Sequence, residues 1–247
     1  MSASAATVRT DTLPDIPAND EREARARRLA MKHSGGDALE ILSVAIKEEF
    51  PGRVALVSSF GAESAALLHL AAQVDKSLPV IFLETGKHFA QTLSYRKRLA
   101  NQLGLTDVRD IHPAADDVAA RDSSGDLWKR DADACCTLRK VEPLAPALGE
   151  FDAWITGRKQ FHGGTRLNLP AFEASPTHIK VNPLVRWGKA DIDAYFAEHN
   201  LPAHPLTAQG YPSIGCWPCT HPAAAGEDLR AGRWRGAAKT ECGIHGR

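Results

Sequence analysis

Five cysteines are the residues of this 247-residue chain whose spacing points most clearly to chemistry. Cys135 and Cys136 are adjacent, Cys216 and Cys219 form a CxxC pair, and Cys242 stands alone. Sets of four thiolates bind zinc or iron–sulfur clusters. Neighbouring cysteines reach a single zinc ion awkwardly, whereas a cubane offers them separate iron atoms. The set therefore favours a [4Fe–4S] cluster, with a zinc site or plain buried thiols as the alternatives.

Cys242 is the cysteine that the four-membered set leaves over. It lies in the segment KTECGIH, residues 239–245, with Glu241 before it and His245 three positions after it. An exposed thiol oxidises and forms unwanted disulfides, so a soluble protein rarely keeps one in such a segment without a use. We therefore expect a reactive thiol here, and nearby cations would favour its thiolate form.

Three loops combine glycine with hydroxyl or cationic side chains, a mixture that suits an anionic ligand. They are SSFGAES at 58–64, ETGKH at 84–88 and TGRKQFHGGTR at 156–166. In the first loop Gly61 permits a tight turn, and backbone N–H groups at the start of a helix attract phosphate or sulfate. This loop lacks the GK[ST] ending of a Walker A motif. An ordinary tight connection is the alternative interpretation.

Hydrophobic periodicity predicts the elements that must position these loops. Apolar runs predict strands at 53–59, 79–85, 107–113, 153–157 and 178–184. Helical composition and spacing predict helices at 21–33, 36–50, 62–74, 92–104 and 189–201. The alternation predicts an α/β fold with a parallel sheet and helices on both of its faces. Ligands of such sheets bind beyond the carboxyl ends of the strands, where the three loops gather.

Composition and segment character predict one folded domain with extensions. The chain has 43% hydrophobic and 24% charged residues, which is ordinary for a soluble folded protein. We expect a disordered leader at 1–20, an α/β domain at 21–201, and at 202–247 an irregular C-terminal cap with a mobile tail, packed on the same domain.

The same composition excludes several classes of protein. A formal net charge of zero argues against a general nucleic-acid binder. No apolar run approaches the ~20 residues that span a bilayer, and residues 1–20 lack the apolar core of a secretory signal. We therefore expect a cytoplasmic protein that binds neither nucleic acid nor membrane.

Four motifs together resemble one enzyme family, the assimilatory adenylylsulfate reductases, which are related to the 3′-phosphoadenylylsulfate reductases. These motifs are the CC…CxxC cysteine set, SSFGAES, LETG at 83–86 and KTECGIH. The resemblance runs from about residue 36 to the end, and it implies the PP-loop fold of the adenine nucleotide α hydrolases. Two features depart from the expected pattern. The SGGxDS of ATP-using relatives is absent, and Glu84 stands where the family more often has aspartate.

The resemblance implies thioredoxin-dependent reduction of adenosine 5′-phosphosulfate (APS) to sulfite and AMP, in sulfate assimilation and cysteine biosynthesis. Cys242 would be the nucleophile and would carry the sulfur as an S-sulfonate. Lys140, Arg230, Arg233 and His245 would offset the negative charge of the sulfate, although isolated arginines are more often solvated surface charge. The cluster would order the cap and place Lys140 beside the sulfate. Nine residues are expected to contact the nucleotide: Ser58, Ser59, Gly61, Ser64, Leu83, Gly86, Gly157, Arg158 and Arg166.

Three other functions stay open on the sequence. A reductase of the 3′-phosphorylated nucleotide, or an enzyme of dual specificity, would use the same chemistry. A tRNA-thiolating PP-loop enzyme would need SGGxDS and a basic surface. A non-catalytic iron–sulfur nucleotide sensor would not need Cys242. The resemblance also allows a homotetramer.

Overall fold

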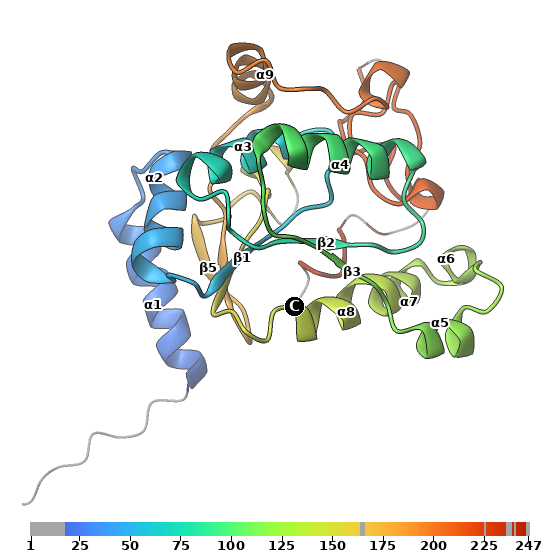
Figure 1. Cartoon of the computed structure of the whole chain (residues 1–247), viewed down its shortest axis with the longest axis horizontal. Coiled ribbons are helices and arrows are strands. Elements are labelled where there is room, and N and C mark those ends of the chain that lie inside the picture. The colour runs from blue at the N-terminus through green and yellow to red at the C-terminus, as the bar shows by residue number, and fades with distance from the viewer. Residues whose placement is uncertain (1–17, 164–165, 225, 236–238, 240, 246–247) are drawn as a thin grey trace, which may run out of the picture.

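Short apolar strands form the centre of the protein, because their residues are covered on both sides and suit a parallel sheet. The computed structural model describes residues 18–163, 166–224, 226–235, 239 and 241–245. Its sheet has six strands in the order β3-β2-β1-β4-β6-β5 (Figure 1). The strands are β1 (Val54–Val57), β2 (Val80–Leu83), β3 (Val108–Ile111), β4 (Ala153–Ile155), β5 (Phe172–Ala174) and β6 (Ile179–Val181).

The strand pairings confirm the predicted α/β fold and its mostly parallel sheet. β1 pairs in parallel with β2 and β4, placing Leu56 opposite Val80 and Val54 opposite Ala153. β2–β3 and β4–β6 are also parallel. β5 pairs antiparallel with β6 at one edge, which the sequence analysis missed. Its three residues are too few to show a period, and their direction is set by the turn that precedes β6.

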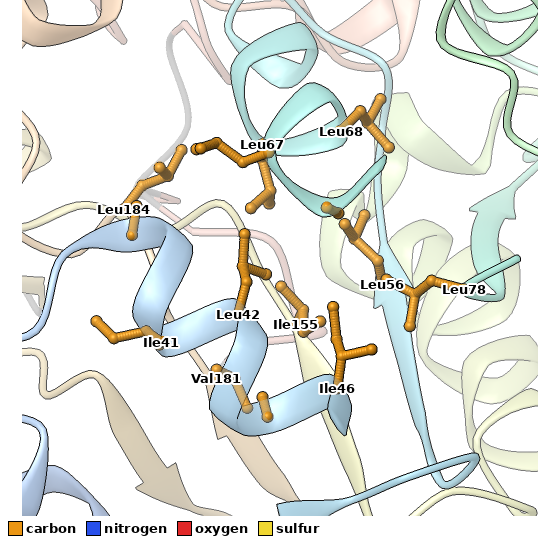
Figure 2. Close-up of a cluster of buried hydrophobic side chains, with 14 of the residues drawn as sticks. Ile41, Leu42, Ile46, Leu56, Leu67, Leu68, Leu78, Ile155, Val181 and Leu184 are labelled. Carbon is orange, nitrogen blue, oxygen red and sulfur yellow. The ribbon is translucent and has the colours of Figure 1, made fainter. Parts of the chain in front are cut away.

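One face of the sheet is covered by the helices whose periodicity was recognised in the sequence. They are α1 (Ala18–Lys32), α2 (Ala38–Ser43), its π-helical continuation η1 (Val44–Glu49), α3 (Ser64–Val74), α4 (Ala90–Leu103) and α9 (Lys189–Glu198). Figure 2 shows the apolar cluster in which Leu42 and Ile46 of this layer meet Leu56, Ile155 and Val181 of the strands. Burying these side chains is the main force that holds the layer in place.

Several short helices that the sequence analysis did not predict follow β3, and the last of them packs on the other face of the sheet. They are α5 (Ala115–Arg121), α6 (Leu127–Arg130), α7 (Ala132–Cys136), the π turn η2 (Thr137–Val141) and α8 (Glu142–Ala147). Leu144 of α8 packs with Ala55, Ile81 and Trp154 of the sheet, and Ile244 packs against the same cluster. These helices are too short for a clear period, and Pro146 lies inside α8. The C-terminal segment thus contributes to the core of this layer.

The structure describes only part of the predicted leader and part of the predicted C-terminal cap. Residues 1–17 of the predicted leader lie outside the described residues, and 18–20 form the first residues of α1. In the described part of 202–247, the helical elements are the short 3₁₀ turns η5 (Thr207–Gln209) and η6 (Trp217–Cys219). The division into an α/β domain and a cap stays a prediction. None of the helices in the described ranges has both the length and the apolar character of a bilayer span.

His204 fastens the C-terminal segment to α4. The Leu206 N–H donates to its Nδ1 at 3.2 Å, so Nε2 carries the proton and donates to the Thr92 hydroxyl at 3.0 Å. The ring meets Tyr95 edge-on, with ring centres 4.8 Å apart, and the Tyr95 hydroxyl donates to the carbonyl of Pro202. Burial and, to a smaller extent, the charge of Arg98 lower the pKa of His204 to about 4. The folded protein therefore holds this imidazole neutral.

Because folding keeps His204 neutral, we expect the free energy of unfolding to decrease at acidic pH. His204 is protonated near pH 6.5 in the unfolded chain and only near pH 4 in the folded chain. Its contribution to the free energy of unfolding is therefore complete above pH 6.5 and is lost as the pH falls from 6.5 to 4. The contribution is at most about 1.4 kcal/mol per pH unit. His204→Gln removes the titration and should flatten this part of the curve in urea unfolding. Equal slopes for the variant and the wild type would contradict the assignment.

Candidate active site

A cavity of about 220 Å³ lies beyond the carboxyl ends of β1, β2 and β4, where the topology of a parallel sheet predicts a ligand site. Ser58 follows β1, Leu83 ends β2, and Gly157 follows β4. The opposite wall comes from the C-terminal segment, through residues that include Arg233 and Cys242. The cavity therefore joins the α/β layer to the last part of the chain.

The structure brings nearly all of the predicted site residues to this cavity. Every residue predicted to be catalytic lines it, and so does every residue predicted to contact the nucleotide except Gly86. These residues are Cys242, Lys140, Arg230, Arg233, His245, Ser58, Ser59, Gly61, Ser64, Leu83, Gly157, Arg158 and Arg166.

Gly86 has a structural task in the described turn after β2. Its backbone has a φ of +69°, in the left-handed region that glycine adopts at no steric cost. Its N–H donates to the Glu84 carboxylate at 2.8 Å. The guanidinium of Arg139 lies 3.5 Å from where a Cβ would stand, and it donates to the carbonyl of Thr85. Gly86 thus shapes the loop without lining the cavity.

The loop at 58–64 makes the tight strand-to-helix turn that was predicted. Phe60 has a φ of +49°, and its N–H donates to the Ser58 hydroxyl at 3.1 Å. The Phe60 ring is buried edge-on against Phe82, with ring centres 5.7 Å apart. At Gly61 a Cβ would stand only 3.0 Å from the carbonyl oxygen of Ile214. Gly61 is therefore needed because the C-terminal segment approaches the loop closely, a reason that the sequence could not reveal.

Buried basic side chains make the cavity an anion site. Arg158, Lys159 and Arg166 are each less than a tenth exposed. Arg158 pairs with Glu173 and Arg166 pairs with Glu241. Positive charge gathered away from water is costly unless it meets anions. The cavity therefore suits a ligand of high negative charge.

Lys159, Glu63 and His162 form a polar group in this wall that the sequence analysis did not assign. The Lys159 ammonium lies 2.8 Å from the Glu63 carboxylate, and His162 lies 3.6 Å from the same oxygen. Burial lowers the pKa of Lys159, and it lowers the pKa of His162 to about 3. The run GRK in the third loop signalled a cation here. Its direction could not be predicted, because the loop has no regular period.

His245 closes the cavity from the C-terminal side. Its ring stacks on Trp154 with ring centres 5.7 Å apart, and Lys180 donates to its carbonyl oxygen at 3.4 Å. Burial lowers the pKa of His245 well below its usual range, and Arg158 and Arg166 lower it further. In the described structure its Nδ1 is buried without a hydrogen-bond partner. A neutral imidazole thus offers one unused polar atom beside the cavity.

Cys242 lies where the cavity meets the cysteine set. When Cys136 is a free thiol, its hydrogen bond to the Cys242 sulfur lowers the pKa of Cys242; burial opposes this effect, and Lys140 and Arg233 lower the pKa independently of the state of Cys136. Burial alone would lower the pKa of Lys140, but the sulfurs of Cys216, Cys242 and Cys136 raise it above its ordinary value. Thiolate and ammonium therefore stabilise each other, which favours the reactive thiolate form of Cys242.

The four other cysteines line a second, smaller cavity that also contacts Lys140 and Arg233. Cys135 and Cys136 end α7, while Cys216 and Cys219 flank and end the turn η6. Burial raises the pKa of Cys135 and of Cys219. Among the described residues, no three His, Cys, Asp or Glu side chains gather closely enough to hold a single metal ion.

Comparisons with known proteins show the family to which the chain belongs. Residues 53–222 match the family described as phosphoadenosine phosphosulfate reductase domain. The chain is 50% identical to the adenosine 5′-phosphosulfate reductase of Chelativorans sp. (strain BNC1) over 93% of both proteins. It is 38% identical to the enzyme of that name from Streptomyces coelicolor (strain ATCC BAA-471 / A3(2) / M145), over 92% of this chain and 96% of that protein.

A solved structure gives the same result for the fold. The phosphoadenylyl-sulfate reductase of Candida auris superposes with a TM-score of 0.68 at 28% identity, over 81% of this chain and 97% of that one. A Candida glabrata FMN adenylyltransferase shares the fold alone, with a TM-score of 0.53 at 15% identity over 81% of this chain and 72% of that one. On the family match and these relatives, the chain belongs to the phosphoadenosine phosphosulfate reductase domain family.

Proposed function

We propose that this chain is an adenosine 5′-phosphosulfate reductase, which converts APS to sulfite and AMP in sulfate assimilation. The observation that carries the proposal is the position of Cys242, which lines a cation-rich cavity at the carboxyl ends of a PP-loop sheet. The names of the relatives at 50% and 38% identity support this substrate.

The first half of the reaction is a transfer of SO₃ to Cys242. The Cys242 thiolate attacks the sulfur of the sulfate group, and a new S–S bond forms. The bond from that sulfur to the bridging phosphate oxygen breaks, and its electron pair leaves with the phosphate of AMP. Thiolate and sulfate are both negative, so Lys140 and Arg233 are placed to offset their repulsion in the transition state.

The second half returns Cys242 to its thiol form. A dithiol protein of the thioredoxin class supplies a thiolate that attacks the Cys242 sulfur, which makes a mixed disulfide and releases sulfite with the S–S electron pair. The second thiol of the helper then attacks its own disulfide sulfur. Cys242 leaves reduced and the helper leaves oxidised. Two electrons are thus transferred by thiol exchange alone.

The chemistry of the donor set supports a [4Fe–4S] cluster. The four cysteines line one small cavity, and two of them are adjacent in the sequence. Adjacent cysteines reach a single zinc ion awkwardly, whereas a cubane binds each cysteine through a different iron atom. When bound, the cluster would join the cap to α7 and add its charge beside Lys140. The residues that would hold it are Cys135, Cys136, Cys216 and Cys219.

Replacing the nucleophile tests the proposed reaction. Cys242→Ser should lower sulfite formation from APS by about a thousandfold or more, because serine is not deprotonated at neutral pH. Wild-type protein mixed with APS alone should gain the mass of one SO₃ group on the peptide that contains Cys242, and a dithiol should release sulfite from it. Undiminished sulfite production by the variant would refute the proposal.

Removing the cation beside the nucleophile tests the electrostatic part. Lys140→Ala should lower kcat by about a hundredfold to a thousandfold, while iron content stays at the wild-type level. Lys97→Ala is the matched control, because Lys97 is exposed on α4 and away from the cavity. A near-normal rate for Lys140→Ala would show that other groups offset the charge.

The cofactor is tested by two serine variants of the same size. Anaerobically purified wild-type protein should be brown and contain iron and acid-labile sulfide in equal amounts. Cys219→Ser should lose the colour and the iron, whereas Cys242→Ser should keep both. A colourless wild-type protein that contains zinc would contradict the cluster and leave the role of Cys242 standing.

A further inference from the structure

Glu241 is a cavity residue that the proposed reaction leaves without a task. Its carboxylate lies against Arg166, with Nε 2.6 Å from one oxygen and Nη2 donating to the other at 2.8 Å. Arg230 lies 3.9 Å from the first oxygen. All three residues line the cavity beside Cys242. The chain therefore places an anion of its own at the arginines of an anion site.

This contact, an ion pair with one hydrogen bond from Nη2, engages the group of Arg166 that a nucleotide phosphate would also use. The fork of an arginine binds two oxygens of a carboxylate or of a phosphate in the same manner. Arg166 is only 6% exposed, so it has little surface left for a second anion. Burial lowers the pKa of Arg230 to about 10, and the neighbouring Arg166 contributes to this shift. The two arginines thus repel each other unless an anion lies between them.

The remaining contacts of the segment show that Glu241 is not needed merely to hold it in place. Lys239 pairs with Asp133 of α7, His245 stacks on Trp154, and Ile244 packs in the apolar cluster of α8. Glu241 is also the only acidic residue in 237–247. Its carboxylate, which lies at Arg166, can therefore compete with a phosphate.

We propose that Glu241 is an internal competitor of the nucleotide. In the free enzyme its carboxylate occupies the phosphate position at Arg166 and Arg230, and it yields this position when the nucleotide binds. After SO₃ has moved to Cys242, the carboxylate returns to the arginines and displaces AMP. The inference rests on the proposed function, because the phosphate in question is that of APS and AMP. It assigns to Glu241 the control of nucleotide affinity and of product release.

The variant Glu241→Gln removes the charge and keeps the size of the side chain. We expect AMP to bind at least about fivefold more tightly, the scale of a typical coupling between two ligands. KM for APS should fall in the same direction, and kcat should fall because AMP leaves more slowly. Calorimetric titration with AMP and steady-state rates at several AMP concentrations measure these changes. A clamp that only positions Cys242 would instead leave AMP affinity unchanged or weaken it, and that result would overturn the proposal.

Two further variants make the comparison specific. Glu227→Gln makes the same charge change at an exposed carboxylate that pairs with Arg235, and it should leave AMP affinity at the wild-type value. In a protein that carries Arg166→Met, adding Glu241→Gln should change AMP affinity much less than it does alone, because the contested arginine is gone. An equal gain in both backgrounds would show that Glu241 does not act through Arg166.

The same titrations separate this inference from the function on which it rests. If the wild-type protein binds neither AMP nor APS, the proposed function fails. If the wild-type protein binds AMP and Glu241→Gln binds it with the same affinity, the reductase assignment stands and the competition fails.

Discussion

Buried positive charge is the constraint on which this site depends. Each cation that the fold takes out of water needs an anion nearby, since desolvation of an unpaired charge costs more than most single contacts return. Lys159 meets Glu63, Arg158 meets Glu173, and Arg166 meets a carboxylate of the C-terminal segment. At the other side Lys140 faces cysteine sulfurs. Anionic groups of the chain itself thus neutralise these buried cations in the absence of a negatively charged ligand.

The topology explains why charges from distant parts of the chain meet. Parallel strands direct all their carboxyl ends to one edge, so the loops after β1 and β4 lie side by side. A short bridge between His88 and Cys216 joins the C-terminal segment to this edge, and a second bridge, between Thr220 and Arg233, lies within the segment. The first bridge joins the cysteine turn to the loop after β2, and the second brings Arg233 to the cavity. The position of the C-terminal segment therefore completes both the cysteine set and the anion site.

The regular patterns of the sequence sufficed for the parallel strands and the long helices, whereas most cavity residues were predicted from the resemblance to a known family. Apolar runs and helical spacing revealed the parallel strands and the long helices. Contacts between irregular segments could not be predicted in this way. The pairing of Lys159 with Glu63 needs the direction of a loop side chain. The closeness of Gly61 to Ile214 needs the position of the cap. The reversed direction of β5 depends on tertiary pairing that three residues do not encode.

The order of residues in the C-terminal segment has a physical consequence. Glu241 and Cys242 are adjacent in the chain, and their side chains reach different partners. The first reaches the arginines and the second reaches Lys140 and the sulfurs of the cysteine set. An anion that moves one of these residues must therefore move the other. Because Glu241 and Cys242 are neighbours in the chain, binding of a phosphate at the anion site also changes the surroundings of the Cys242 thiol.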